Sequence, residues 1–109
     1  MNLNEEHLES VREGLLITLK AVIRGETGII EGSRKIQACR LDLADDFDED
    51  FTLFVAVDSE TDHLPVDEER RNWSVEALAR KDIEIAEAED YFRPDVLAAC
   101  RKLIARFEK

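Results

Sequence analysis

The sequence predicts an all-α protein, a compact bundle of about five helices that forms one domain over residues 1–109. Two observations support this prediction. Apolar residues recur at helical spacing in four long segments, and a glycine or a proline stands at two of the boundaries between them. The one strand-like segment, FTLFVAV at residues 51–57, has no second strand in the chain with which to pair.

The first two helices are predicted over residues 4–24 and from about 28 to 43. The apolar stripe of the first consists of Leu8, Val11, Leu15, Leu19, Val22 and Ile23. Gly25 then offers a left-handed stop, because glycine adopts a positive φ without a Cβ clash. The stripe of the second helix consists of Ile29, Ile36 and Leu43, with Cys39 close to it. Gly32 and Ser33 would let a neighbouring helix approach closely.

Residues 51–57 are ambiguous, because aromatic and β-branched residues favour a strand. A lone strand would leave its backbone groups unpaired unless two chains paired across a dimer, whereas a helix satisfies its own groups. As a helix, the segment places four residues on one face: Phe51, Phe54, Val55 and Asp58. The acids at residues 48–50 would lie near its N-terminus, where the helix dipole favours negative charge. We therefore predict a helix.

The C-terminal part is predicted to form a short helical turn and two further helices. The turn covers Asp67–Asn72, and the next helix covers residues 74–92 with Ser74 as its N-cap. Leu78, Ile85 and Phe92 form the stripe of that helix. We expect Arg93 and Pro94 to interrupt it, because proline suits the first turn of a new helix. The last helix then carries the stripe Val96, Leu97, Cys100, Leu103, Ile104 and Phe107.

Length and composition indicate a single folded domain in the cytoplasm. The chain of 109 residues can bury one modest core, and its hydrophobic content of 44% is ordinary for a folded protein. No apolar run approaches the roughly 20 residues of a membrane span. The acidic N-terminus, MNLNEEHLES, differs from a secretory signal. Cys39 and Cys100 are expected as free thiols, because the cytosol is reducing.

Negative charge is concentrated in the middle of the chain. The net charge is −11, and residues 45–90 alone contribute −13 from 17 acids and four bases. Leu41–Glu69 contains twelve acids and no lysine or arginine. Such a block repels nucleic acid and attracts cationic surfaces, so we predict a docking surface for a basic protein, with a merely solubilising face as the alternative. The predicted partner-binding residues are Asp45, Asp46, Phe47, Asp48, Glu49, Asp50, Asp58, Glu60, Asp62, His63 and Trp73, the aromatic ones being candidate anchors.

The segment DSETDHLPV at residues 58–66 is predicted to be the structured end of a helix. Its Ser, Thr and Asp side chains can bond to nearby backbone groups and so define a turn. Asp58 would lie on the apolar side of its helix and need a partner, for which Arg34 and Arg40 are candidates. A ligand or partner site is the alternative for this segment. Two further acids either flank the apolar stripe of the 74–92 helix or are paired within it: Asp82 and Glu89.

Metal binding and catalysis are weaker hypotheses. The run DDFDED matches the first half of a calcium loop, but Phe51 and Val57 occupy the positions that need glycine and glutamate. Glu84, Glu87 and Asp90 are spaced by three, and acids so spaced hold metals in helical nucleotide pyrophosphohydrolases. Those enzymes use acidic motifs on two helices, whereas one helix carries the whole set here. No nucleophile elbow or phosphate-binding glycine loop occurs, so we expect no cofactor.

Three runs of the sequence resemble a family of short bacterial proteins of unknown function: GIIEGSRKI, DFTLFVAVDSETDHLPVDEERRNW and ALARKDIEIAEAE. The resemblance implies a small, soluble bacterial protein and carries over no catalytic residue. A short, acidic, helical chain is also similar in kind to immunity proteins, which present acidic helices and loops to a basic nuclease toxin, although no motif matches theirs. We therefore predict a binding module, of the type of an immunity-like inhibitor of a basic partner protein. We expect it to bind neither nucleic acid nor a membrane. The alternatives are a small metal-dependent hydrolase and a homodimer without catalytic activity.

Overall fold

The chain forms four α-helices and one short 3-10 helix in a computed structural model that describes residues 3–45 and 47–108. The α-helices are α1 (Leu3–Ile23), α2 (Ile29–Leu43), α3 (Glu49–Thr61) and α4 (Val75–Phe107), and the 3-10 helix η1 is Asp67–Asn72. The described residues contain no strand. The predicted all-α class is confirmed, as is the helix over residues 51–57.

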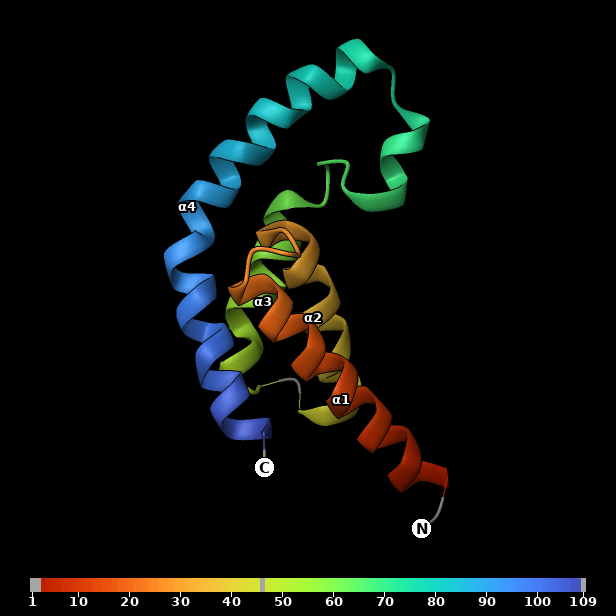
Figure 1. Cartoon of the computed structure of the whole chain (residues 1–109), viewed down its shortest axis with the longest axis vertical. Helices are drawn as coiled ribbons and strands as arrows, with labels where there is room; N and C mark the ends of the chain where they lie inside the picture. The colour runs from red at the N-terminus through yellow and green to blue at the C-terminus, as the bar shows by residue number, and fades with distance from the viewer. Residues whose placement is uncertain (1–2, 46, 109) are drawn as a thin grey trace.

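Helices α1, α2 and α3 lie together along one side of the long helix α4 (Figure 1). The 33 residues of α4 span about 50 Å at 1.5 Å per residue, which accounts for the longest dimension of the molecule, 51 Å. All buried residues of α4 lie from Phe92 onward. Its first half, residues 75–91, extends beyond the other α-helices (Figure 1). None of the described helices is long and apolar enough to cross a membrane.

The hydrophobic core lies between α1, α2, α3 and the second half of α4. Its buried residues are Leu15, Leu19, Val22, Ile29, Ile36, Phe51, Phe54, Val57, Phe92, Val96, Cys100 and Leu103. Helix α3 contributes Phe51, Phe54 and Val57, none of which is exposed. Their spacing of three places them on one face of a helix, so helical packing explains the apolar character of a segment that resembles a strand.

The end of α1 is set by Gly25, as predicted. Gly25 has a φ of 76°, which glycine adopts without a Cβ clash. Its N–H donates to the carbonyl of Val22 at 3.1 Å, and the N–H of Glu26 donates to the carbonyl of Ala21 at 2.9 Å. This pair of hydrogen bonds is a Schellman motif, which satisfies the last carbonyls of the helix and turns the chain toward α2.

The predicted break at Arg93 and Pro94 is wrong, because α4 continues through both residues. Proline removes one helical hydrogen bond, which here leaves the Asp90 carbonyl without its usual donor. Pro94 is exposed, so water can reach this part of the helix. Phe92 and Val96, on either side of it, are both buried in the core. Packing on both sides therefore holds the helix together, and α4 bows around the core (Figure 1).

Both cysteines are free thiols, as predicted. Cys100 is fully buried in the core, and burial raises the pKa of its thiol to about 11. Cys39 is half-buried, and desolvation raises the pKa of its thiol as well. Since the thiolate is the reactive form, neither residue is suited to act as a nucleophile.

Candidate functional site

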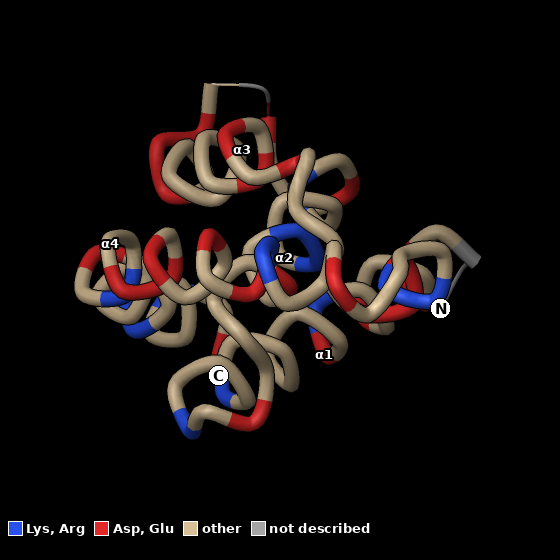
Figure 2. Tube along the Cα trace, turned by 90° about the horizontal axis from the view of Figure 1, so that it is seen from above, with Lys and Arg blue, Asp and Glu red and all other residues tan. Residues whose placement is uncertain are grey.

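The segment Leu41–Glu69 contains no lysine or arginine, but the fold brings lysine and arginine side chains from other parts of the chain next to it. Helix α3 carries only acidic charged positions, whereas basic positions gather on the neighbouring α2 (Figure 2). Among the described acids of the segment, five form ion pairs with arginine or lysine: Asp48, Asp50, Asp58, Glu68 and Glu69. Their partners come from α2, η1 and α4. Much of the negative charge is therefore neutralised within the fold.

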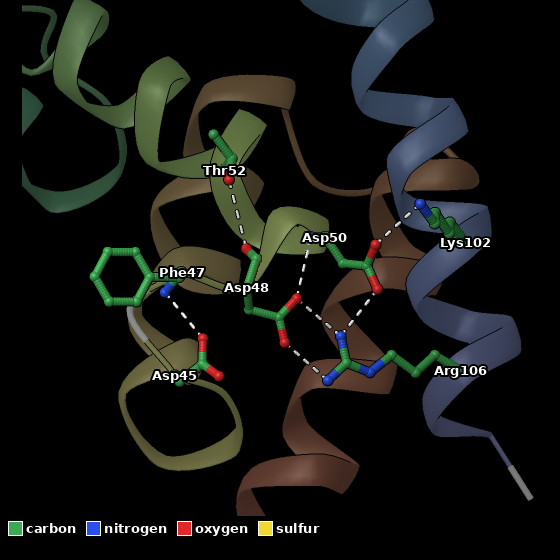
Figure 3. A network of polar contacts seen from close by, with 7 residues as sticks. All are labelled: Asp45, Phe47, Asp48, Asp50, Thr52, Lys102 and Arg106. Atoms are coloured by element: carbon green, nitrogen blue, oxygen red, sulfur yellow. Dashed lines mark hydrogen bonds and ion pairs between the residues drawn. The ribbon is translucent and has the colours of Figure 1, made fainter.

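The most connected of these ion pairs joins the N-terminus of α3 to the end of α4 (Figure 3). Arg106 Nη2 lies 2.8 Å from Asp48 Oδ2, and its Nη1 lies 2.9 Å from both Asp48 Oδ1 and Asp50 Oδ2. Lys102 Nζ lies 3.0 Å from the other oxygen of Asp50. Asp48 is also the N-cap of α3, since its Oδ1 accepts from the N–H of Asp50 at 3.1 Å. These two acids hold α3 against α4.

The ion pairs lower the pKa values of both carboxyls. Hydrogen bonding from Arg106 is the main cause of the lowered pKa of Asp48. Hydrogen bonds from Lys102 and then Arg106 lower the pKa of Asp50. A carboxyl whose pKa is lowered in the folded state stabilises the fold above its unfolded pKa, about 4, and loses this effect as the pH falls through the folded pKa.

We therefore expect Asp48→Asn to destabilise the protein at pH 7 by about 1 kcal/mol. Asparagine still caps the helix, so the loss reports the ion pair alone. The difference from the native protein should shrink as the pH falls below about 4, where the unfolded chain takes up the proton, and should vanish below the lower pKa that Asp48 has in the folded chain. Urea unfolding at neutral and acidic pH measures both effects.

The exposed Asp45 provides the matched control for this measurement. Its side chain forms no ion pair with the described residues and accepts a hydrogen bond from the N–H of Phe47, at 2.9 Å. Asp45→Asn should change the free energy of unfolding by less than about 0.5 kcal/mol. A pH-independent loss for Asp48→Asn would show that the ion pair does not stabilise the fold.

Arg34 organises the DSETDHLPV segment from α2. Its Nη2 donates to the carbonyls of Thr61 and Leu64 at 2.6 and 2.9 Å, and its Nε lies 3.5 Å from Asp58 Oδ1. The hydroxyl of Thr61 donates to the carbonyl of Val57 at 2.6 Å, and Leu64 is only 2% exposed. The predicted structured helix end is confirmed, together with Arg34 as the partner of Asp58.

The two acids near the stripe of α4 are both paired. Asp82 forms a two-point ion pair with Arg70 of η1, with N–O distances of 2.7 and 3.1 Å. Glu89 Oε2 accepts from the N–H of Ile30 at 3.2 Å, at the first turn of α2. Gly28, the N-cap of α2, supplies no side chain for this purpose. Glu89 of α4 therefore caps the N-terminus of α2, a helix that comes earlier in the sequence.

The structure divides the predicted partner-binding residues into two groups. Asp48, Asp50 and Asp58 are held in internal ion pairs, so they belong to the scaffold and we remove them from the predicted surface. Asp46 lies outside the described residues. The others are exposed: Asp45, Phe47, Glu49, Glu60, Asp62, His63 and Trp73. The four acids of this group form no ion pair within residues 3–45 and 47–108: Asp45, Glu49, Glu60 and Asp62.

The alternative metal ligands Glu84, Glu87 and Asp90 do not converge. Six residues of helix rotate Asp90 about 120° away from Glu84, and Asp90 pairs with Arg93. In the described part of the chain, no three His, Cys, Asp or Glu side chains gather as a metal site requires. Glu84 and Glu87 instead line a groove that also contains Glu60 and His63. The sequence did not predict this groove, because its two sides lie about 24 residues apart in the chain.

The fold and these contacts define the protein as a helical bundle with an acidic surface on α3, on the turn after it and on α4. Comparisons with known protein families, curated proteins and solved structures find no match for this chain. The resemblance to a family of short bacterial proteins therefore stays a prediction. Any function has to be argued from the surface itself.

Proposed function

We propose that this protein is an acidic binding module that docks a basic partner protein. The observation that carries the proposal is the set of exposed carboxylates at the two ends of α3. Glu49, Glu60 and Asp62 are exposed and have no ion pair with any described residue. Since Asp48, Asp50 and Asp58 of the same segment have internal partners, these three are among the acids left to attract a cationic surface.

The scaffold supports this proposal by fixing the backbone on which the three carboxylates stand. Glu49 is the first residue of α3, next to the N-cap Asp48, which Arg106 holds. Glu60 and Asp62 flank Thr61, whose carbonyl accepts from Arg34. A rigid acidic surface loses little conformational entropy on binding, so complementary charge can speed association and select a basic partner.

Inhibition of the bound partner is the finer form of the proposal, in the manner of immunity proteins. It requires the acidic surface to cover a basic functional site on the partner. A binding module of this kind needs no cofactor, and its effect depends on buried contacts that slow dissociation. Phe47, whose side chain is 91% exposed, is the candidate for such a contact.

Charge reversal tests the proposal. We expect the variant with Glu49→Lys, Glu60→Lys and Asp62→Lys to lose at least roughly tenfold of its capture of a basic protein from native cell extract. Capture by the native protein should also fall as salt is added, because added ions screen exposed charges. Quantitative mass spectrometry of the captured proteins, ranked by their charge, provides the measurement.

The matched control carries the same charge change elsewhere. Glu6, Glu13 and Asp95 are exposed acids on α1 and α4, outside the segment Leu41–Glu69. Reversing these three to lysine should leave capture within about twofold, because long-range screening limits what distant charges contribute. Circular dichroism must show that both variants keep their helices. Equal capture by the two variants would refute the proposed surface.

A further inference from the structure

A groove between the end of α3 and the first half of α4 stands out on the acidic side of the molecule. It has a volume of about 370 Å³, within the range of pockets that bind small ligands. One side is formed by Glu60, Thr61, His63 and Leu64, and the other by Glu84, Glu87, Ala88, Tyr91 and Phe92. The groove thus joins an acidic rim to an apolar floor.

Carboxylates stand on both sides of this groove. Glu60, from α3, and Glu87, from α4, have no ion pair with the described residues. Glu84 lies 3.3 Å from Lys81 Nζ and 3.5 Å from His63 Nε2, so its charge is partly balanced. The groove therefore retains negative charge on two separate elements.

An open aromatic ring lies beside these acids. The side chain of Tyr91 is 77% exposed, although its ring makes an edge-to-face contact with Phe92 at 5.0 Å between centroids. Glu84, Glu87 and Tyr91 follow one another at spacings of three and four, so they share one face of α4. An aromatic face next to carboxylates attracts a flat organic cation.

The chemistry distinguishes between cations. The acids lie on separate walls and, in the described residues, do not converge in a set of three that could hold a metal ion. A guanidinium group is planar, has five N–H donors and stacks on aromatic rings, so it can use separated carboxylates and a ring together. The ammonium of lysine is a compact point charge and gains less from the ring.

We propose that this groove receives an arginine side chain from a basic segment of the partner protein. The inference rests on the proposed function and adds the place and the residue type that are recognised. Glu60 and Glu87 would pair with the guanidinium from opposite sides, and Tyr91 would stack on it. Leu64 and Phe92, both buried at the floor, would contact the apolar stem of the arginine.

Titration with designed peptides tests the groove. The probes are a short amphipathic peptide with arginines on one face, its lysine counterpart and its citrulline counterpart, which keeps the shape and removes the charge. We expect the arginine peptide to shift backbone amide NMR signals of residues 60–64 and 84–92. The lysine peptide should bind at least about threefold more weakly, and the citrulline peptide should not bind.

Matched variants separate the groove from general attraction. Glu60→Gln with Glu87→Gln should lower the affinity for the arginine peptide at least roughly tenfold. Glu6→Gln with Glu13→Gln removes the same charge from exposed positions on α1, outside the groove, and should change binding by less than about twofold. Tyr91→Ala should lower the affinity for the arginine peptide about threefold to tenfold, whereas Tyr91→Phe should bind it like the native protein.

The outcomes also separate this inference from the proposed function. Equal weakening by the two glutamine pairs, equal binding of arginine and lysine peptides, or no binding of the arginine peptide would overturn the groove. Each of these results leaves the charge-reversal capture experiment untouched, because that experiment does not depend on peptide probes. Loss of the proposed function would instead appear as equal capture by the two lysine variants.

Discussion

Replacing Phe51 with alanine is expected to lower the free energy of unfolding by about 3–5 kcal/mol. The ring is fully buried at the start of α3 and makes an edge-to-face contact with Phe107, with centroids 6.2 Å apart. Truncation would remove the apolar contacts of the ring and leave a cavity between α3 and the end of α4. Because small domains are stable by only about 5–15 kcal/mol, this loss is a large part of the total. Urea unfolding followed by helical circular dichroism measures it.

Phe47 gives the matched control, because the same residue type stands four positions earlier and is 91% exposed. Phe47→Ala should change the free energy of unfolding by less than about 0.5 kcal/mol. Phe51→Leu keeps most of the buried volume and should cost less than about 1.5 kcal/mol. Similar losses for the two alanine variants would mean that α3 is not packed against α4 as the structure describes.

Two features of helix α3 could be predicted from the sequence. The helix over FTLFVAV followed from a physical argument, that a single strand would leave its backbone unpaired. The same reasoning predicted that Asp58 needs a partner and that Arg34 or Arg40 could supply it. Each of these predictions depends on local spacing or on a single unsatisfied group. Features of either kind can be recognised in the sequence alone.

The ion pairs of Asp48 and Asp50 could not be predicted in the same way. Arg106 is 58 residues beyond Asp48, and nothing in local spacing indicates that the two ends meet. The continuous α4 escaped prediction for a related reason, since the penalty of Pro94 is local whereas the packing that offsets it comes from the whole core. An acidic run in sequence therefore overstates the negative charge that reaches the surface.

The groove combines both difficulties. Glu60 and His63 were predicted as binding residues, and Glu84 and Glu87 only as alternative metal ligands, without any indication that the two pairs line one groove. Tyr91 was not predicted at all, because an aromatic residue near the end of an apolar stripe reads as core. Its side chain is 77% exposed at the groove, and the spacing of residues on α4 alone does not indicate this.

Gly32→Ala is the second substitution with a large expected effect. A Cβ on Gly32 would lie 2.3 Å from Cγ2 of Val22, so α1 and α2 approach too closely there for any side chain. Val22 is buried, and as a β-branched residue in a helix it has one strongly preferred rotamer, so it cannot turn aside. Overpacking costs about 1–3 kcal/mol, against roughly 1 kcal/mol gained in helix propensity. We expect a net loss of up to about 2 kcal/mol in urea unfolding.

A double-mutant cycle with Val22→Ala tests the cause. Val22→Ala alone leaves a cavity, but in combination with Gly32→Ala the new methyl group occupies part of that space. The free energy of unfolding lost by the double variant should therefore be at least about 1 kcal/mol smaller than the sum of the two single losses. Gly14 is the control, since it lies exposed on α1 and a Cβ added there would meet no atom within 4 Å. Gly14→Ala should stabilise the protein by about 0.5–1 kcal/mol, because there the gain in helix propensity meets no steric cost. Strictly additive losses at Gly32 and Val22 would place the strain elsewhere than in the contact between α1 and α2.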